Sequence, residues 1–309
     1  MIIALTSVIK LIRPEARAVF PYSNSLYIDD EMQTLIDAGS GGRAFAEVPV
    51  DNIELLLLSH NHFDHVNGIS FFPQARIMAG REEALTYQDQ ELYLKFSGFY
   101  DWERLMGEMD RRLLSGTMPL PEDVPAQRGF QEVQLDGLIK DGDVFELGVT
   151  SLRAIHLPGH SPGHYAFYCE KEGILFSADL DLAPDGPWYG GGLSDFDELE
   201  KSIKKLIEIN PRILVTSHRR VFDAAQDNIP ALLQTYLDVP LKKEEQSLVY
   251  LAEPRTIDDI ARQDFIEGFK GKTPFAVFFT KMMIDKHLKR LEKAGKVKKI
   301  DDTHYIRIG

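Results

Sequence analysis

One short segment constrains this chain more than any other part of its sequence. Three histidines and an aspartate lie within His60-Asn-His62-Phe-Asp64-His65, directly after the apolar run at residues 53–58. Such a run predicts a strand buried on both faces, and loops at strand ends commonly carry functional residues. His60 and His62 are spaced to reach one metal ion, whereas Asp64 and His65 point elsewhere and can serve a second. Because imidazole and carboxylate are natural ligands of zinc, iron and manganese, the segment predicts a metal site.

Three later segments add candidate ligands at the ends of predicted strands. His160 lies in the turn Leu157-Pro-Gly-His-Ser-Pro-Gly-His164, where glycine gives the backbone the freedom to aim a side chain at a metal. Asp179 and His218 each follow an apolar strand-like run. Together with the segment at His60, these positions predict one pocket.

These motifs make the chain resemble the metallo-β-lactamase superfamily over about residues 1–225. The resemblance implies two metal ions with a shared aspartate, and it assigns the ligands as follows: His60, His62 and His160 to the first metal, Asp64, His65 and His218 to the second, and Asp179 between them. It also implies that Asp37, in Leu35-Ile-Asp-Ala-Gly39, supports the metal loop as a hydrogen-bond acceptor.

Two positions depart from the family pattern. Ala178 stands where a glycine usually precedes the bridging aspartate, and His218 lies in Ser-His-Arg instead of the common Gly-His-Gly. Neither change removes a ligand, so we expect them to affect the substrate and the shape of the loops more than metal binding.

The fold implied by the resemblance is α/β, a four-layer αββα sandwich with the metals at one edge of the two sheets. We expect a catalytic domain at 1–228, with a helical insertion at about 81–128, and a helical, winged-helix-like domain at 229–309. The aromatic residues of the insertion are expected mainly to pack in a core, with a lid over the site as the alternative. Three helices followed by a small hairpin at the C-terminal end give the order of a winged-helix module.

The implied activity is metal-dependent hydrolysis of an ester, thioester or phosphoester. A metal-bridging hydroxide would be the nucleophile, and Asp64 would both ligate a metal and steer the hydroxide. The expected cofactors are two divalent ions, with zinc preferred and iron or manganese as alternatives.

Other functions stay open at this point. The chain is also similar to the β-lactamase-like protein 2 type, which has a C-terminal winged-helix-like module and includes an endonuclease of single-stranded RNA. A mononuclear iron enzyme similar to persulfide dioxygenases and a non-enzymatic winged-helix regulator are further alternatives. A β-lactamase proper is not expected, because no export signal is visible. The flavodiiron branch is disfavoured because it requires a glutamate at the position of His62.

The net charge and composition limit the kinds of molecule that this chain is expected to bind. The 309 residues carry a net charge of -13, which disfavours nonspecific binding to nucleic acid. Residues 240–309 nevertheless hold 15 basic and 11 acidic residues, and the stretch from Lys281 to Lys299 is a candidate nucleic-acid surface. A small-molecule substrate is preferred, with the C-terminal module in substrate or homodimer contacts. With no apolar run of ~18 residues and no signal-peptide pattern, we expect no membrane span and a cytoplasmic location.

The remaining residues of interest have competing interpretations. His164 is expected either as a substrate or metal-supporting contact or, with His156, as a structural partner of the strands, and we favour the structural role. Trp188 is expected near the mouth of the pocket. His287 and His304 are expected at the surface. Cys169 is the single cysteine, so the chain forms no internal disulfide and the ligands must be histidines and carboxylates.

Overall fold

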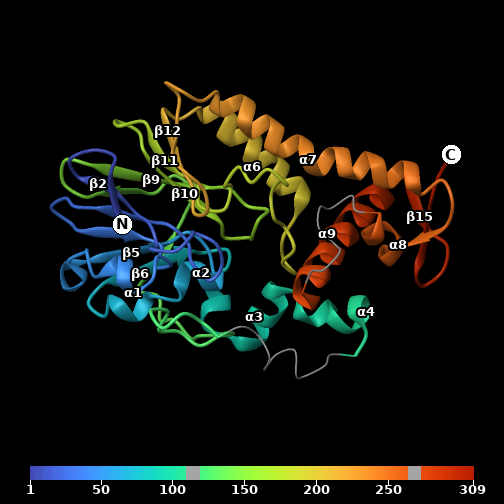
Figure 1. Cartoon of the computed structure of the whole chain (residues 1–309), viewed down its shortest axis with the longest axis horizontal. Coiled ribbons are helices and arrows are strands. Elements are labelled where there is room, and N and C mark those ends of the chain that lie inside the picture. Colours follow the sequence, from blue (N-terminus) through green and yellow to red (C-terminus); the bar gives the residue numbers. More distant parts are fainter. Residues whose placement is uncertain (109–118, 264–272) are drawn as a thin grey trace.

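The computed structural model describes residues 1–108, 119–263 and 273–309, and two facing sheets form its body (Figure 1). The first sheet has seven strands that lie in chain order. Its pairs are antiparallel from β1 to β4 and parallel from β4 to β7. The strands are β1 (Ile2–Ala4), β2 (Ile9–Ile12), β3 (Ser25–Ile28), β4 (Thr34–Ile36), β5 (Leu55–Leu58), β6 (Arg76–Gly80) and β7 (Gly137–Ile139).

The second sheet has six strands in the order β13-β12-β11-β10-β9-β8. The β11–β12 pair is parallel, and the other pairs are antiparallel. The strands are β8 (Val144–Glu146), β9 (Ser151–His156), β10 (Tyr165–Cys169), β11 (Ile174–Phe176), β12 (Ile213–Val215) and β13 (Phe222–Asp223).

Successive side chains of the central strands point to opposite faces of the sheet, which explains why the sheets and helices form layers. Leu55 and Leu57 of β5 pack in the core between the sheets, whereas Leu56 and Leu58 pack on the outer face of the first sheet. A strand that is apolar on both faces must be covered on both sides. The first sheet is covered by short helices and turns: α1 (Gly42–Phe45), η1 (Val50–Asn52), α2 (Phe63–Val66) and η2 (Ile69–Phe71).

The outer face of the second sheet is covered by two longer helices, α6 (Phe196–Ile209) and α7 (Ile229–Tyr250), which lie side by side (Figure 1). Asp195 begins α6 by accepting a hydrogen bond from the Glu198 amide, and buried Leu199, Ile203 and Leu206 follow at helical spacing. The predicted four-layer αββα sandwich is therefore confirmed.

The insertion between β6 and β7 begins as predicted. It forms η3 (Ala84–Tyr87), α3 (Gln90–Ser97), η4 (Phe99–Asp101) and α4 (Trp102–Met106). Part of the expected helical segment, 109–118, lies outside the described residues. The insertion closes in the proline-rich residues 119–128, which form turns because proline cannot donate a helical hydrogen bond.

Beyond α7 the chain forms a small module with the sheet order β14-β16-β15. Its elements are β14 (Arg255–Thr256), α8 (Ile257–Arg262), α9 (Pro274–Lys293), β15 (Val297–Lys299) and β16 (His304–Arg307). Thr256 and Asp259 form a capping box at the start of α8. This order of elements supports the winged-helix prediction, which stays a prediction. Among the described residues, no helix is both long and apolar enough to cross a membrane.

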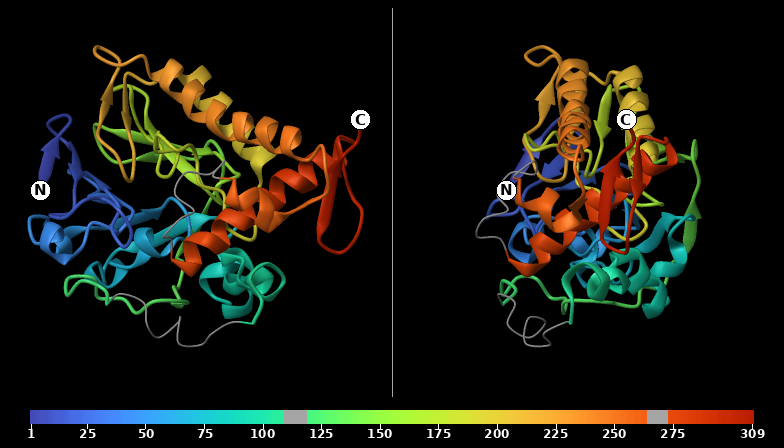
Figure 2. Two further views of the ribbon diagram at one scale, coloured as in Figure 1. Left: turned by 45° about the vertical axis from the view of Figure 1, so that its right-hand side comes forward. Right: turned by 90° about the vertical axis from the view of Figure 1, so that its right-hand side faces the viewer.

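Helix α9 is buried on more than one side and joins the module to the insertion, as Figure 2 shows. Ile284 and Leu288 pack within the module, whereas Phe278 and Met282 pack against Trp102 of α4. Both Asp285 carboxylate oxygens accept hydrogen bonds from Arg104 of α4, at 3.0 and 2.9 Å. The insertion and the C-terminal module therefore form one packed unit beside the sandwich.

Candidate metal centre

The predicted ligands come together at one edge of the two sheets. His60 and His62 follow β5, and His160 lies in the turn between β9 and β10. Asp179 follows β11, and His218 follows β12. The parallel strands β11 and β12 end at the same edge, so their following residues meet the loop after β5 across the sandwich.

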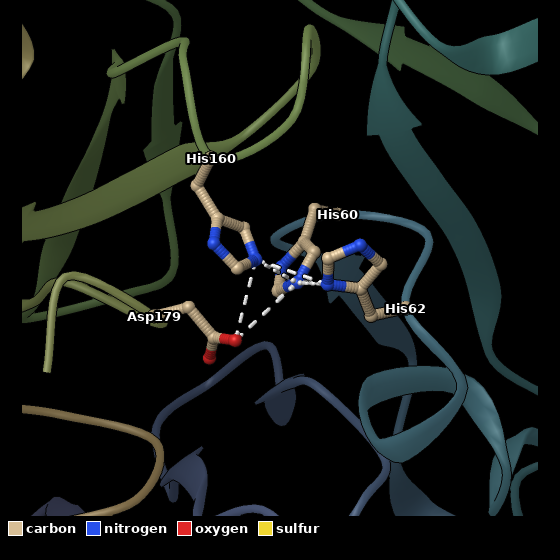
Figure 3. A group of neighbouring side chains, drawn as sticks. All are labelled: His60, His62, His160 and Asp179. Atoms are coloured by element: carbon tan, nitrogen blue, oxygen red, sulfur yellow. Dashed lines mark hydrogen bonds and ion pairs between the residues drawn. The ribbon is translucent and has the colours of Figure 1, made fainter. Parts of the chain in front are cut away.

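A first group of ligand atoms is formed by three imidazoles and a carboxylate (Figure 3). His160 Nε2 lies 3.1 Å from His60 Nε2 and 2.9 Å from His62 Nδ1, and the latter two atoms are 2.9 Å apart. Oδ2 of Asp179 lies 3.3 Å from His160 Nε2. The side chains point toward a common centre from three separate segments of the chain.

A second group lies on the other side of Asp179 and consists of Asp64, His65 and His218. Oδ1 of Asp179 lies 3.0 Å from His65 Nε2 and 3.3 Å from His218 Nε2. His218 Nε2 is also 3.4 Å from Asp64 Oδ2. Asp179 thus turns one carboxylate oxygen toward each group, as a bridging ligand would.

Asp37 fixes two of the imidazoles from behind. Its Oδ2 accepts a hydrogen bond from His65 Nδ1 at 2.7 Å and another from the Ser59 hydroxyl at 2.7 Å. Because that hydroxyl proton is used, Ser59 Oγ accepts from His60 Nδ1 at 2.9 Å. In His60 and His65 the Nδ1 proton is therefore held on the outside, and each Nε2 lone pair faces the centre.

Two backbone carbonyls orient the other imidazoles in the same way. His160 Nδ1 donates to the Trp188 carbonyl at 2.9 Å, and His218 Nδ1 donates to the Ala18 carbonyl at 3.2 Å. Their Nε2 atoms are then acceptors that face the ligand groups. Metal-binding histidines are commonly held by such outer partners.

The donor set fits divalent cations. His65 Nε2 and Asp179 Oδ1 are fully buried and have no hydrogen-bond partner among the described residues. The lone pairs of His60, His62 and His160 meet at about 3 Å and cannot satisfy one another. Since buried acceptors without donors are costly, cations coordinated by nitrogen and carboxylate oxygen would satisfy both groups.

The pKa shifts of the imidazoles differ in direction between the two groups. Burial holds the pKa of His60 and His62 well below the ordinary imidazole value, so both stay neutral and able to ligate. Burial also opposes the charge on His218, but the charge and hydrogen bond of Asp179 and the charge of Asp64 together outweigh it and raise the pKa of His218 to about 9. The same negative charge that attracts a proton there would attract a metal ion.

Glu83 is a supporting residue that the sequence did not reveal. Its buried carboxylate accepts hydrogen bonds from the Asn61 backbone amide at 2.6 Å, the Ser161 hydroxyl at 2.7 Å and the Gly163 backbone amide at 2.9 Å. Asn61 lies between His60 and His62, and Ser161 follows His160, so one carboxylate ties together the loops of three candidate ligands. Burial raises the pKa of Glu83 to about 7. No local motif marks this residue, which lies in the insertion.

The other predicted residues are placed as follows. His164 is fully buried behind Asp179, where its Nδ1 donates to the Leu157 carbonyl at 3.1 Å and its Nε2 accepts from the Asp179 amide at 3.3 Å. His156 bonds the Pro162 carbonyl at 2.7 Å. His304 lies on the exposed terminal hairpin. The surface expectation for His287 is wrong, because its side chain is buried between neighbouring helices.

Ala178 explains one departure from the family pattern. Its φ is 47°, in the left-handed region that usually favours glycine, and its side chain is fully buried. The alanine therefore keeps the sharp turn that presents Asp179, at the cost of backbone strain of about 1–2 kcal/mol.

The fold and the ligand arrangement define a class of metalloprotein, and the comparison with known families agrees. Residues 18–218 match the model of the metallo-beta-lactamase superfamily. The chain belongs to this superfamily. A solved structure of a metallo-beta-lactamase family protein from Thermus thermophilus superposes with a TM-score of 0.70 at 21% identity, covering 99% of this chain and 100% of that one.

Several curated proteins are similar to this chain in sequence. It is 24% identical to the beta-lactamase-like protein 2 homolog of Drosophila melanogaster, over 82% of this chain and 75% of the relative. It is 28% identical to the acyl-coenzyme A thioesterase MBLAC2 of Bos taurus, over 60% of this chain and 67% of the relative. It is 29% identical to the atrochrysone carboxyl ACP thioesterase of Aspergillus fumigatus, and that match spans about half of each chain, 48%.

Proposed function

We propose that this chain is a binuclear metal hydrolase that cleaves acyl thioesters. The observation that carries the proposal is the convergence of five imidazoles and two carboxylates in two adjoining groups at the sheet edge. Two of the relatives described above are named thioesterases, which favours a thioester over the ester and phosphoester alternatives.

Each candidate ligand has a role in this proposal. His60, His62 and His160 hold the first ion, Asp64, His65 and His218 hold the second, and Asp179 bridges them. Bound divalent ions would supply Lewis acidity at the scissile carbonyl and a hydroxide at neutral pH. Zinc is the proposed metal, since it suits imidazole and carboxylate ligands. Asp64 is also the proposed steering residue, because its carboxylate belongs to the second group and lies 3.4 Å from His218 Nε2.

An aromatic surface beside the first ligand group is the proposed site for the acyl chain. The ring of Trp188 lies 5.2 Å from that of His62 and 5.4 Å from that of Phe279 on α9. The buried ring of Phe96 on α3 lies 5.3 Å from the ring of His62. The insertion and the C-terminal module each contribute to this surface, which gives both a role in substrate binding.

The contacts of the basic stretch Lys281 to Lys299 favour a small-molecule substrate over RNA. Lys281 pairs with Asp258 at 2.7 Å and donates to the Leu105 carbonyl at 2.7 Å. Arg290 pairs with carboxylates on α6 and α7, and Lys289 pairs with Asp285. Phosphate binding needs cations that are free to meet the backbone. Lys281 and Arg290 are engaged within the protein, and Lys289, which is 66% exposed, is paired with Asp285.

The proposal is tested by metal analysis and turnover together. Protein purified without added metal or chelator is expected to contain about two zinc ions per chain and to hydrolyse an acyl-coenzyme A. Asp64→Asn is expected to abolish hydrolysis and keep the fold, whereas Asp51→Asn on the exposed surface is expected to change neither. Near-normal turnover of Asp64→Asn would contradict the mechanism. One iron per chain with oxygen consumption would favour the dioxygenase alternative.

A further inference from the structure

Arg219 stands directly after the candidate ligand His218 and has an unusual environment. Its Nε is fully buried and has no hydrogen-bond acceptor among the described residues. The Asp181 carboxylate lies 3.8 Å from that atom, beyond hydrogen-bonding distance, and the side chain is 41% exposed. A guanidinium offers five donors, so this one retains most of its binding capacity.

The next residue, Arg220, has a guanidinium that is held by contacts within the protein. Arg220 donates two hydrogen bonds to Asp227, at 2.7 and 2.6 Å, and its guanidinium stacks on the ring of Phe222 at 4.2 Å. Arg220 is therefore held by hydrogen bonds and stacking, whereas the guanidinium of Arg219 makes one long ion pair, with Asp181 at 3.8 Å.

The backbone of Arg219 is held firmly at the edge of the site. Its amide donates to the Thr216 hydroxyl at 3.1 Å, and its carbonyl accepts from the buried Asn24 side chain at 3.2 Å. The same Asn24 amide group also donates to the Thr216 carbonyl at 2.9 Å. The turn after β12 thus fixes both His218 and the starting point of the Arg219 side chain.

Arg219 and the aromatic surface adjoin different ligand groups. Trp188 and Phe96 flank His62 in the first ligand group, whereas Arg219 follows His218 in the second, on the other side of Asp179. A thioester whose carbonyl lies between the two groups would direct its acyl chain to the aromatic rings. Its thiol portion would then extend toward Arg219.

We propose that Arg219 binds a phosphate group on the thiol portion of the substrate. Arginine donors match the geometry of phosphate and carboxylate oxygens in a two-pronged contact. The inference rests on the proposed thioester hydrolysis and names its substrate class: acyl thioesters of a phosphorylated thiol. In a chain with net charge -13, a partly exposed cation whose ion pair with Asp181 is long also attracts an anionic substrate.

The test compares three thioesters that share one acyl group: hexanoyl-coenzyme A, S-hexanoyl-glutathione with carboxylates, and neutral S-hexanoyl-N-acetylcysteamine. Arg219→Gln is expected to lower kcat/KM for hexanoyl-coenzyme A by about 10- to 100-fold, mainly through KM, since charged hydrogen bonds contribute about 1.5–3 kcal/mol. Hydrolysis of the neutral thioester is expected to change by less than about threefold. Arg219→Lys should restore part of the loss, and Arg220→Gln is the matched control.

Other outcomes are equally decisive. A loss confined to the glutathione thioester would overturn the phosphate assignment in favour of a carboxylate, and equal losses for all three thioesters would overturn anion recognition altogether. Calorimetric titration with coenzyme A gives a readout that does not depend on turnover: unchanged affinity in Arg219→Gln contradicts the inference. Failure of the proposed function appears differently, as a wild-type protein that binds coenzyme A but hydrolyses none of the thioesters.

Discussion

The hydroxyl of Tyr189 lies 2.6 Å from Nε2 of His287, and this contact joins the loop beside the metal centre to helix α9. His287 Nδ1 bonds the Glu244 carboxylate of α7 at 2.7 Å, so its Nε2 is the acceptor for the Tyr189 hydroxyl. Tyr189 directly follows Trp188, whose carbonyl holds Nδ1 of His160. The C-terminal module therefore supports the orientation of a candidate metal ligand.

Removing this contact is expected to weaken both stability and metal binding. Tyr189→Phe leaves the buried His287 Nε2 without its donor, which should lower the free energy of unfolding by about 1–3 kcal/mol. The loosened loop should also reduce metal affinity, measured by competition with a chromogenic chelator. Tyr168→Phe is the control, because that partly buried tyrosine has no hydrogen bond from its hydroxyl among the described residues. Equal effects of the two substitutions would contradict the role of the Tyr189 contact.

Glu83 provides a second test of how the ligand loops are held. Glu83→Gln replaces one carboxylate oxygen by an NH2 group, which must face either the Asn61 amide or the donors of Ser161 and Gly163. Loss of such an outer partner is expected to weaken metal binding about 10- to 100-fold. Glu82→Gln is the neighbouring control, with metal affinity close to that of the unchanged protein. If both variants bind metal normally, Glu83 does not position the loops.

The two ligand groups predict separable metal sites. His160→Ala removes a ligand of the first group and His218→Ala one of the second, so each variant should retain about one ion per chain. Asp179→Asn weakens the residue that faces both groups and should reduce both occupancies. Elemental analysis after dialysis against a weak chelator measures these differences. Identical metal contents in all three variants and the unchanged protein would refute the proposed ligand sets.

Complete removal of metal is expected to lower the melting temperature. A ligand that binds only the folded state stabilises it in proportion to the logarithm of its concentration over Kd. Without cations, buried His65 Nε2 and Asp179 Oδ1 have no hydrogen-bond partner among the described residues. Treatment with EDTA should therefore shift thermal unfolding downward, and zinc should restore it. No shift in either direction would show that metal binding is not linked to folding.

The sandwich was implied by the family resemblance, and the residues that meet at its edge could be predicted because their signals are local. The apolar run before His60 identifies a buried strand, and the clustered histidines directly follow it. Glu83 and His287 carry no such signal, because their importance arises from contacts with Asn61 and Tyr189. In the same way, the charge pattern around Arg290 predicted an exposed basic surface. The pairing of Arg290 with Asp197, Glu200 and Glu244 depends on tertiary packing that no local pattern encodes.

Cys169 gives a prediction about reactivity that is independent of the metal centre. Its side chain is fully buried in the core between the sheets, and burial raises the pKa of the thiol to about 12. Because only the thiolate reacts, about one thiol in 10⁴ is ionised at pH 8, against about one in ten for an unperturbed thiol of pKa 9. Ellman's reagent should therefore modify the native protein very slowly and the guanidinium-unfolded protein completely, with one thiol per chain. Raising the pH from 7 to 9 should leave native labelling slow, since access also requires opening of the core. Rapid stoichiometric labelling of the native protein would contradict the burial of this residue between the two sheets.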